Sequence, residues 1–190
     1  MKVQPLTCSL FFLFITGCTS SQIDTSVKLA AQSFGVNIGS SQQSAINNQT
    51  NYFKNLSDAQ KNQILSQLNL GESKHSGQLK IAIGEAKSTI FTSLAILSCS
   101  ADNNPPSSLS QFSLVGSYPF SLFSTPLSRI GKNKNQCVTV KSIDDWEIDE
   151  NSKIKFTVVY IANDTQQTVR AHYFMQKNSN KWLFYRSYIS

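Results

Sequence analysis

Apolar residues change their spacing near Cys137, and this change restricts the possible folds more than any other feature of the sequence. Before that residue they recur at the three- and four-residue steps of an amphipathic helix, most clearly in residues 79–98. After Cys137, apolar and polar residues alternate in the ranges 137–143, 153–162, 168–177 and 182–189, which is typical of strands. The order of elements, helices and then strands, predicts an α+β fold, in which N-terminal helices pack on a curved antiparallel meander of about four strands.

Two helices are expected before the strands. Ser57 is suited to be an N-cap, and Gln60, three residues later, would complete a capping box. Gly71 offers a C-terminal stop for this first helix. A second helix is expected from about Leu79 to Ser98, with one apolar face turned toward the core.

The first 17 residues have the order of a secretory signal rather than that of a structural element. Lys2 supplies a positive start, residues 6–15 are uncharged and rich in Leu and Phe, and small residues follow. This apolar stretch is about half as long as the roughly 20 residues that a membrane-spanning helix needs. We therefore expect a removable signal peptide in residues 1–17.

The end of this signal, Phe14-Ile15-Thr16-Gly17-Cys18, resembles the lipobox of bacterial lipoprotein precursors, which ends in a small residue and an invariant Cys. The resemblance implies cleavage before Cys18, a diacylglyceryl thioether on its sulfur, and usually an acyl chain such as palmitate on the new terminus. Several acyl chains would anchor the protein firmly in a membrane, whereas a single chain binds only marginally. The alternative is an ordinary signal cleaved near Gly17, which would leave a soluble secreted protein.

Thr19 and Ser20 follow the lipidated Cys. In diderm bacteria an Asp just after that Cys tends to retain lipoproteins at the inner membrane. Because no Asp stands there, the resemblance favours an outer-membrane lipoprotein that faces the periplasm.

The mature chain is expected to consist of a tether and one domain. Residues 18–51 would carry the lipid and form a flexible tether, because Ser, Gln, Asn and Thr bury too little apolar surface to become ordered. Residues 52–190 would form the single α+β domain. The net charge of +6 is dispersed along the chain without a basic helix, so binding of nucleic acid is not expected.

Cys99 and Cys137 remain once Cys8 leaves with the signal and Cys18 carries lipid. Two thiols in an oxidising compartment are expected to form a disulfide. A redox or metal-binding pair is the alternative, although the two residues lack the spacing of a zinc or thioredoxin motif.

The last two expected strands also resemble the closing hairpin of the nuclear transport factor two superfamily, also described as cystatin-like. The likeness lies in residues 168–177, a polar turn, and Lys181-Trp182-Leu183-Phe184-Tyr185. It implies a curved sheet around a pocket, which relatives use for ligand binding, catalysis or protein docking. The fold alone does not choose among these functions.

The sequence contains few candidate catalytic groups. The chain has two histidines, of which His75 is expected in a polar loop, whereas His172 lies in a strand and could face either the pocket or the solvent. The acidic segment 144–150 is expected to be a solvated loop with Trp146 turned inward, and it lacks the ligand order of a calcium loop. We therefore expect no catalytic residue, metal or cofactor.

Aromatic residues suggest binding instead. Tyr118, Phe120 and Phe123 stand beside Pro119, which disfavours a central strand, so they are candidates for a partner contact or for covering one end of the core. The expected function is that of a membrane-anchored, non-enzymatic envelope lipoprotein that binds a protein or a small apolar ligand. The alternatives are an enzyme with the same conical fold that uses His172, and a surface lipoprotein that binds cell-wall or host material.

Overall fold

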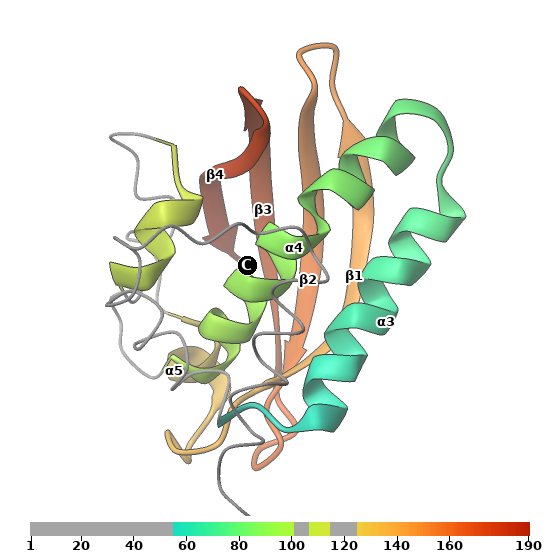
Figure 1. Ribbon diagram of the computed structural model, residues 1–190. Coiled ribbons are helices and arrows are strands. Elements are labelled where there is room, and N and C mark those ends of the chain that lie inside the picture. The colour runs from blue at the N-terminus through green and yellow to red at the C-terminus, as the bar shows by residue number, and fades with distance from the viewer. Residues whose placement is uncertain (1–54, 101–106, 115–124) are drawn as a thin grey trace, which may run out of the picture. The chain divides into compact units, whose positions relative to one another are not determined.

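A computed structural model describes residues 55–100, 107–114 and 125–190 of the chain (Figure 1). The α+β prediction is confirmed, because helices precede a four-stranded antiparallel sheet with the order β1-β2-β3-β4. The elements are α3 (Asp58–Lys74), α4 (Gly77–Cys99), the 3-10 helix η2 (Ser107–Phe112), α5 (Pro126–Ile130), β1 (Thr139–Ile148), β2 (Lys153–Ile161), β3 (Thr168–Asn178) and β4 (Lys181–Ile189).

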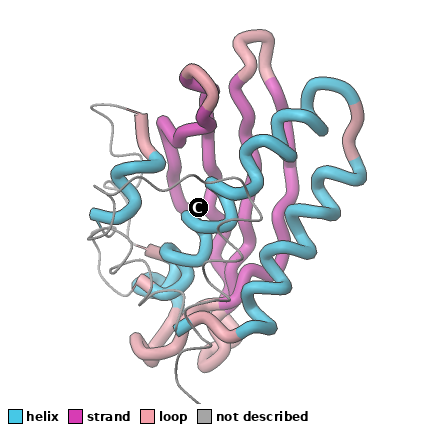
Figure 2. The backbone as a smooth tube through the Cα atoms, viewed as in Figure 1, coloured by secondary structure: helices cyan, strands magenta, loops and turns pink. Residues whose placement is uncertain are grey.

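Helices α3 and α4 lie on one face of the sheet, as the tube view also shows (Figure 2). The apolar residues of the alternating pattern in the strands face these helices. Phe156, Val158 and Tyr160 of β2 and Met175 of β3 are fully buried, and most of their neighbours are more exposed; Thr157, between Phe156 and Val158, is the exception and is buried too. The period-two pattern therefore predicted both the strands and the face that each strand turns to the core.

The predicted start of the first helix is confirmed, but its predicted end is wrong. Ser57 and Gln60 form a complete capping box. Gly71 does not end α3, which continues to Lys74, and the chain turns only before Gly77, whose φ is +59°. Gly71 is buried inside the helix because the indole of Trp146 lies directly against it.

The acidic segment is also placed differently from the prediction. Asp144, Asp145 and Glu147 belong to β1 and not to a loop, whereas Asp149 and Glu150 lie in the turn that follows. Trp146 does point inward, as expected, and its ring stacks on Phe156 with a centroid distance of 4.6 Å. The carboxylates are tolerated in a strand because they lie on the face of the sheet away from the core.

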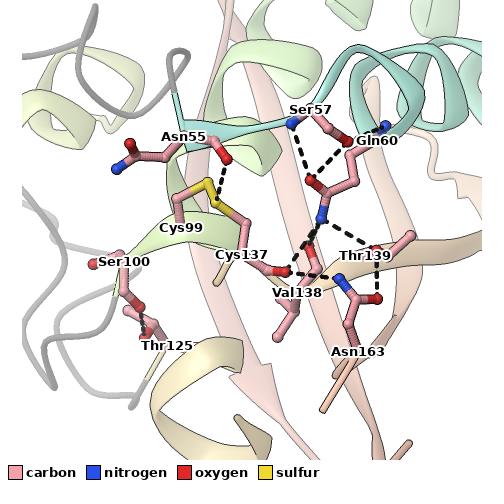
Figure 3. Close-up of a disulfide and its surroundings, with 10 residues drawn as sticks. All are labelled: Asn55, Ser57, Gln60, Cys99, Ser100, Thr125, Cys137, Val138, Thr139 and Asn163. Atoms are coloured by element: carbon pink, nitrogen blue, oxygen red, sulfur yellow. Dashed lines mark hydrogen bonds between the residues drawn. A yellow bond between two sulfur atoms is a disulfide. The ribbon is translucent and has the colours of Figure 1, made fainter. Parts of the chain in front are cut away.

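The expected disulfide joins Cys99 at the end of α4 to Cys137 just before β1 (Figure 3). The backbone N–H of Val138 donates to the carbonyl oxygen of Ser98 over 2.9 Å. The side-chain amide of Gln60 reaches the same place from α3, where its Nε2 donates to the carbonyl oxygen of Cys137 over 3.2 Å. Three segments distant in sequence are thus held together beside the disulfide.

Helix α4 is the only helix among the described residues that is long and apolar enough to be a candidate membrane span, with a mean hydropathy of 1.2. Of its most apolar window, 56% is buried inside the domain. The buried residues include Ile83, Ile90 and Leu94, which pack in the core. The apolar character of α4 is therefore accounted for by its place in the core.

Candidate functional site: the open face of the sheet

The described residues place no helix on the face of the sheet that lies opposite α3 and α4 (Figure 1). We call it the open face. On this side β3 and β4 present His172, Phe174, Tyr185 and Tyr188, which we call the ring cluster. All four side chains are partly exposed, although their neighbours in sequence are mostly buried. Large aromatic side chains that remain partly exposed on a rigid sheet are suited to binding.

The ring cluster is continuous across the two strands. His172 stacks on Tyr188 with 4.5 Å between the ring centroids, and Phe174 lies 6.0 Å from Tyr188. Phe174 also lies 6.1 Å from Tyr185. These distances are in the range in which aromatic pairs attract each other. The rings therefore support one another and form an ordered surface rather than separate mobile side chains.

Two cations lie over the ring cluster. The guanidinium of Arg186 is 5.3 Å from the centroid of Phe174 and 5.6 Å from that of Tyr188. The ammonium group of Lys153 is 5.4 Å from the centroid of Tyr185. Such contacts stabilise a cation by roughly 0.5–1 kcal/mol when it is exposed. Among the described residues, neither cation has a carboxylate within salt-bridge distance.

The β1 side of the open face is acidic, and two of its carboxylates pair with cations of β2 and β3. Glu147 binds Lys155 of β2 at 2.9 Å, and Asp145 lies 3.5 Å from Arg170 of β3. The hydrogen bond to Glu147 raises the pKa of Lys155. These ion pairs are exposed and add little to stability. Their importance is that they show which way the carboxylates point.

His172 lies on the open face, so it does not face the helices as the pocket hypothesis required. Its Nδ1 is 3.1 Å from Oγ1 of Thr157, and its Nε2 is 3.2 Å from Oγ of Ser190. Burial is the largest cause of a lowered pKa, and the nearby charge of Arg170 lowers it further. The contact with Ser190 has the reach of a nucleophile and its base. However, Thr157 offers a hydroxyl where a carboxylate would be needed to stabilise an imidazolium.

The opposite face of the sheet, against the helices, is lined by packed rings. Phe156 lies 5.5 Å from Tyr173, and Tyr173 lies 5.8 Å from Phe184. The hydroxyl groups of Tyr160 and Tyr173 are 2.9 Å apart, and burial raises the pKa of both. Both phenols therefore stay neutral and satisfy each other as a polar pair within the core.

Several residues singled out in the sequence lie outside the described residues. These are the lipidation candidate Cys18 and the contact candidates Tyr118, Phe120 and Phe123. No group of three or more His, Cys, Asp or Glu side chains that could hold a metal ion occurs in the described part of the chain. The Cys99–Cys137 pair forms the disulfide and so is not a metal or dithiol pair in this structure.

The ring cluster itself was missed from the sequence. The signal that could have identified it is parity, because Phe174 and Tyr185 occupy strand positions that alternate with the buried ones. An aromatic residue at such a position faces away from the core.

Comparison with known protein families, curated proteins and solved structures found no significant match to this chain.

Proposed function

We propose that this chain is a lipid-anchored envelope protein without catalytic activity, whose α+β domain binds a protein partner through the open face. The ring cluster, with Arg186 and Lys153 above it, is the observation that carries the proposal. Tyr and Arg side chains are enriched among the residues that dominate the energy of protein interfaces. Because the sheet is rigid, these side chains also lose little conformational entropy when a partner binds.

The anchor rests on the sequence. The apolar stretch before Cys18 and the small residues next to it support cleavage and lipidation, and an anchored domain searches for partners only near its membrane. The disulfide between Cys99 and Cys137 is compatible with an exported protein, since disulfides form and persist in oxidising compartments.

The arrangement around His172 favours binding over catalysis. Hydroxyl groups lie next to both ring nitrogens, and Tyr188 stacks on the ring. A lowered pKa makes the imidazole a weaker base, and no described carboxylate hydrogen-bonds to it. The ring is thus held as part of the surface rather than prepared to move a proton.

Photo-crosslinking of the full chain in its own membranes tests the binding proposal. A benzophenone amino acid replaces Tyr185 on the open face, and a control chain carries it at Gln78, an exposed residue of α4. We expect an adduct from residue 185 that is lost in the Arg186→Glu background, and none from residue 78. Equal adducts from both sites, or none from residue 185, would overturn the use of the open face.

Mass spectrometry of the same material tests the anchor. We expect a chain that begins at Cys18 and carries the mass of a diacylglyceryl group, with or without a further acyl chain. An unmodified chain with another N-terminus would show that the anchor is wrong, while leaving the crosslinking result to decide the binding proposal.

A further inference from the structure

One row of side chains crosses the open face from edge to edge. Glu147 of β1 is paired in register with Lys155 of β2, Lys155 with Phe174 of β3, and Phe174 with Arg186 of β4. The row therefore reads acidic, basic, aromatic, basic. Acidic groups are concentrated at the β1 edge, and Arg186, one of the two cations over the ring cluster that lack a carboxylate partner, lies at the β4 edge.

From this row we propose that the open face binds the open face of a second copy of this chain. The inference deepens the proposed function by naming the partner that this surface fits. The two copies would be related by a two-fold axis that lies in the interface, parallel to the strands and between β2 and β3. Such an axis exchanges β1 with β4 and β2 with β3, and a two-fold interface uses the same patch on both copies.

This axis matches each member of the row with a complementary one. Glu147 of one copy comes opposite Arg186 of the other, and Lys155 comes opposite Phe174. Each contact occurs twice because of the symmetry. The first is an ion pair, and the second places an ammonium group on an aromatic ring.

The neighbouring row obeys the same rule. Asp144 is in register with Thr157, Thr157 with His172, and His172 with Tyr188. The same axis brings the carboxylate of Asp144 opposite the phenol of Tyr188, and a carboxylate accepts from a phenol. Thr157 is buried and its hydroxyl is bonded to His172 of its own chain, so the contacts of this row between copies are those of Asp144 and Tyr188.

Other arrangements fit the charges less well. A two-fold axis perpendicular to the strands would place β1 on β1 and bring Glu147 against its own counterpart, which is repulsive. An anionic membrane lying on the whole face would meet Asp145 and Glu147 as well as the cations. A uniformly acidic partner would meet the same carboxylates. The bipolar charge of the face therefore favours a second copy.

The size of the face explains why the membrane matters. Sheet strands about 4.8 Å apart and roughly 30 Å long give four strands an area of roughly 500–600 Å². Specific interfaces typically bury about 800 Å² on each partner, so the contact would be weak between dilute copies. Anchoring both copies in one membrane raises their effective concentration without any new contact.

The test uses the full chain in its own membranes, with the benzophenone amino acid at Tyr185 and detection of an adduct of twice the mass of one chain. Either Arg186→Glu or Glu147→Arg alone should lower the yield of that adduct by about tenfold or more, because each creates like-charge contacts. Lys80→Glu, at an exposed residue of α4, is the matched charge-reversal control and should leave the yield unchanged.

Mixing the two variants makes the test specific to a second copy. When differently tagged Arg186→Glu and Glu147→Arg chains are co-expressed, both opposed pairs become complementary again, so the adduct between the two tags should return. Failure to return, with both variants folded by circular dichroism, would overturn the two-fold arrangement. If the only adduct formed from residue 185 in the wild type has a mass other than twice that of one chain, the partner is not a second copy, but the proposed function stands. If residue 185 forms no adduct at all, the proposed function is overturned as well.

Discussion

Gly71 of α3 lies directly against the indole of Trp146 in β1, where a Cβ atom on the glycine would be only 2.7 Å from Nε1. The ring is also held from its other side, since it stacks on Phe156, and its Nε1 donates to the carbonyl oxygen of Ile143 over 3.2 Å. The helix and the strand therefore approach each other as closely as a missing side chain allows.

Gly71→Ala should destabilise the domain even though Ala is the better helix former. Propensity alone would add about 1 kcal/mol of stability. Here the added methyl group must displace a packed ring, so we expect a net loss of roughly 1–3 kcal/mol. The measurement is the free energy of unfolding in urea.

Gly84→Ala is the matched control in α4. Its Cβ would lie 3.2 Å from Oε1 of Glu72, which is the end of a flexible, partly exposed side chain that pairs with Lys87 and can shift more easily than a packed ring. We expect this variant to be neutral or more stable by up to about 1 kcal/mol. If both variants gain stability alike, the close approach of Trp146 does not limit the packing.

Gln60 has two roles that a single substitution can separate. Its Oε1 accepts from the backbone N–H of Ser57, and its Nε2 donates to the carbonyl oxygen of Cys137 and to Oγ1 of Thr139. Gln60→Glu keeps the acceptor for the capping box and suits the helix N-terminus, but it turns a carboxylate toward these oxygen atoms. We expect a loss of about 1–2 kcal/mol in the free energy of unfolding.

Ser57→Ala provides the comparison, because it removes only the N-cap and should cost about 1 kcal/mol. A Gln60→Glu variant as stable as the wild type would mean that only the capping box matters. In that case the contact between α3 and the start of β1 would contribute nothing measurable.

The disulfide should contribute strongly to stability. It closes a loop with a sequence separation of 38, for which the chain-entropy model gives about 4 kcal/mol. Replacing both Cys99 and Cys137 by Ala should lower the free energy of unfolding by an amount of this order. Reductant should destabilise the wild type in the same way and have no effect on the double variant. A wild type insensitive to reductant, when reduction is verified by mass, would contradict the prediction.

The fold could be predicted from the sequence where it depends on a local pattern of residues. It could not be predicted where a contact between two segments distant in sequence determines the structure. Alternation in β2 and β3 identified Phe156 and Met175 as inward residues, because side-chain period depends only on the strand itself. Gly71 was read as a helix end, since its partner Trp146 is far away in sequence. Asp145 and Glu147 were read as a loop, because their cationic partners Arg170 and Lys155 come from other strands.

The candidate site shows the same division. The ring cluster depends on the cross-strand register that places His172 beside Tyr188 and Phe174 beside Arg186. That register includes an irregularity between Phe174 and Met175, which turns both Tyr185 and Arg186 away from the core. A bulge of this kind changes the face to which the following side chains point, and a strictly alternating sequence pattern does not reveal where it lies. Parity alone identifies Phe174 and Tyr185 as outward residues, whereas the outward positions of Arg186 and Tyr188 became visible only once the strands were paired.

His172 should make the stability of the domain depend on pH. Its pKa is lowered from 6.5, first because the ring is partly buried and then because Arg170 repels the imidazolium; Lys155 opposes protonation too, whereas Asp145 favours it. The folded domain thus binds this proton less tightly than the unfolded chain does. The contribution is fully present above about pH 6.5 and is lost as the pH falls below it toward the folded pKa.

The check is the free energy of unfolding of the wild type and of His172→Gln, each at about pH 7.5 and about pH 5.5. Carboxylates contribute equally to both proteins, so the difference between their pH responses reports His172. We expect the wild type to lose more stability on acidification than the variant, because only the wild type must accept a proton beside Arg170 and Lys155. An identical loss in both would mean that protonation does not disturb the open face. A larger loss in the variant would reverse the sign and show that the imidazolium is stabilised there, by Asp145 above all.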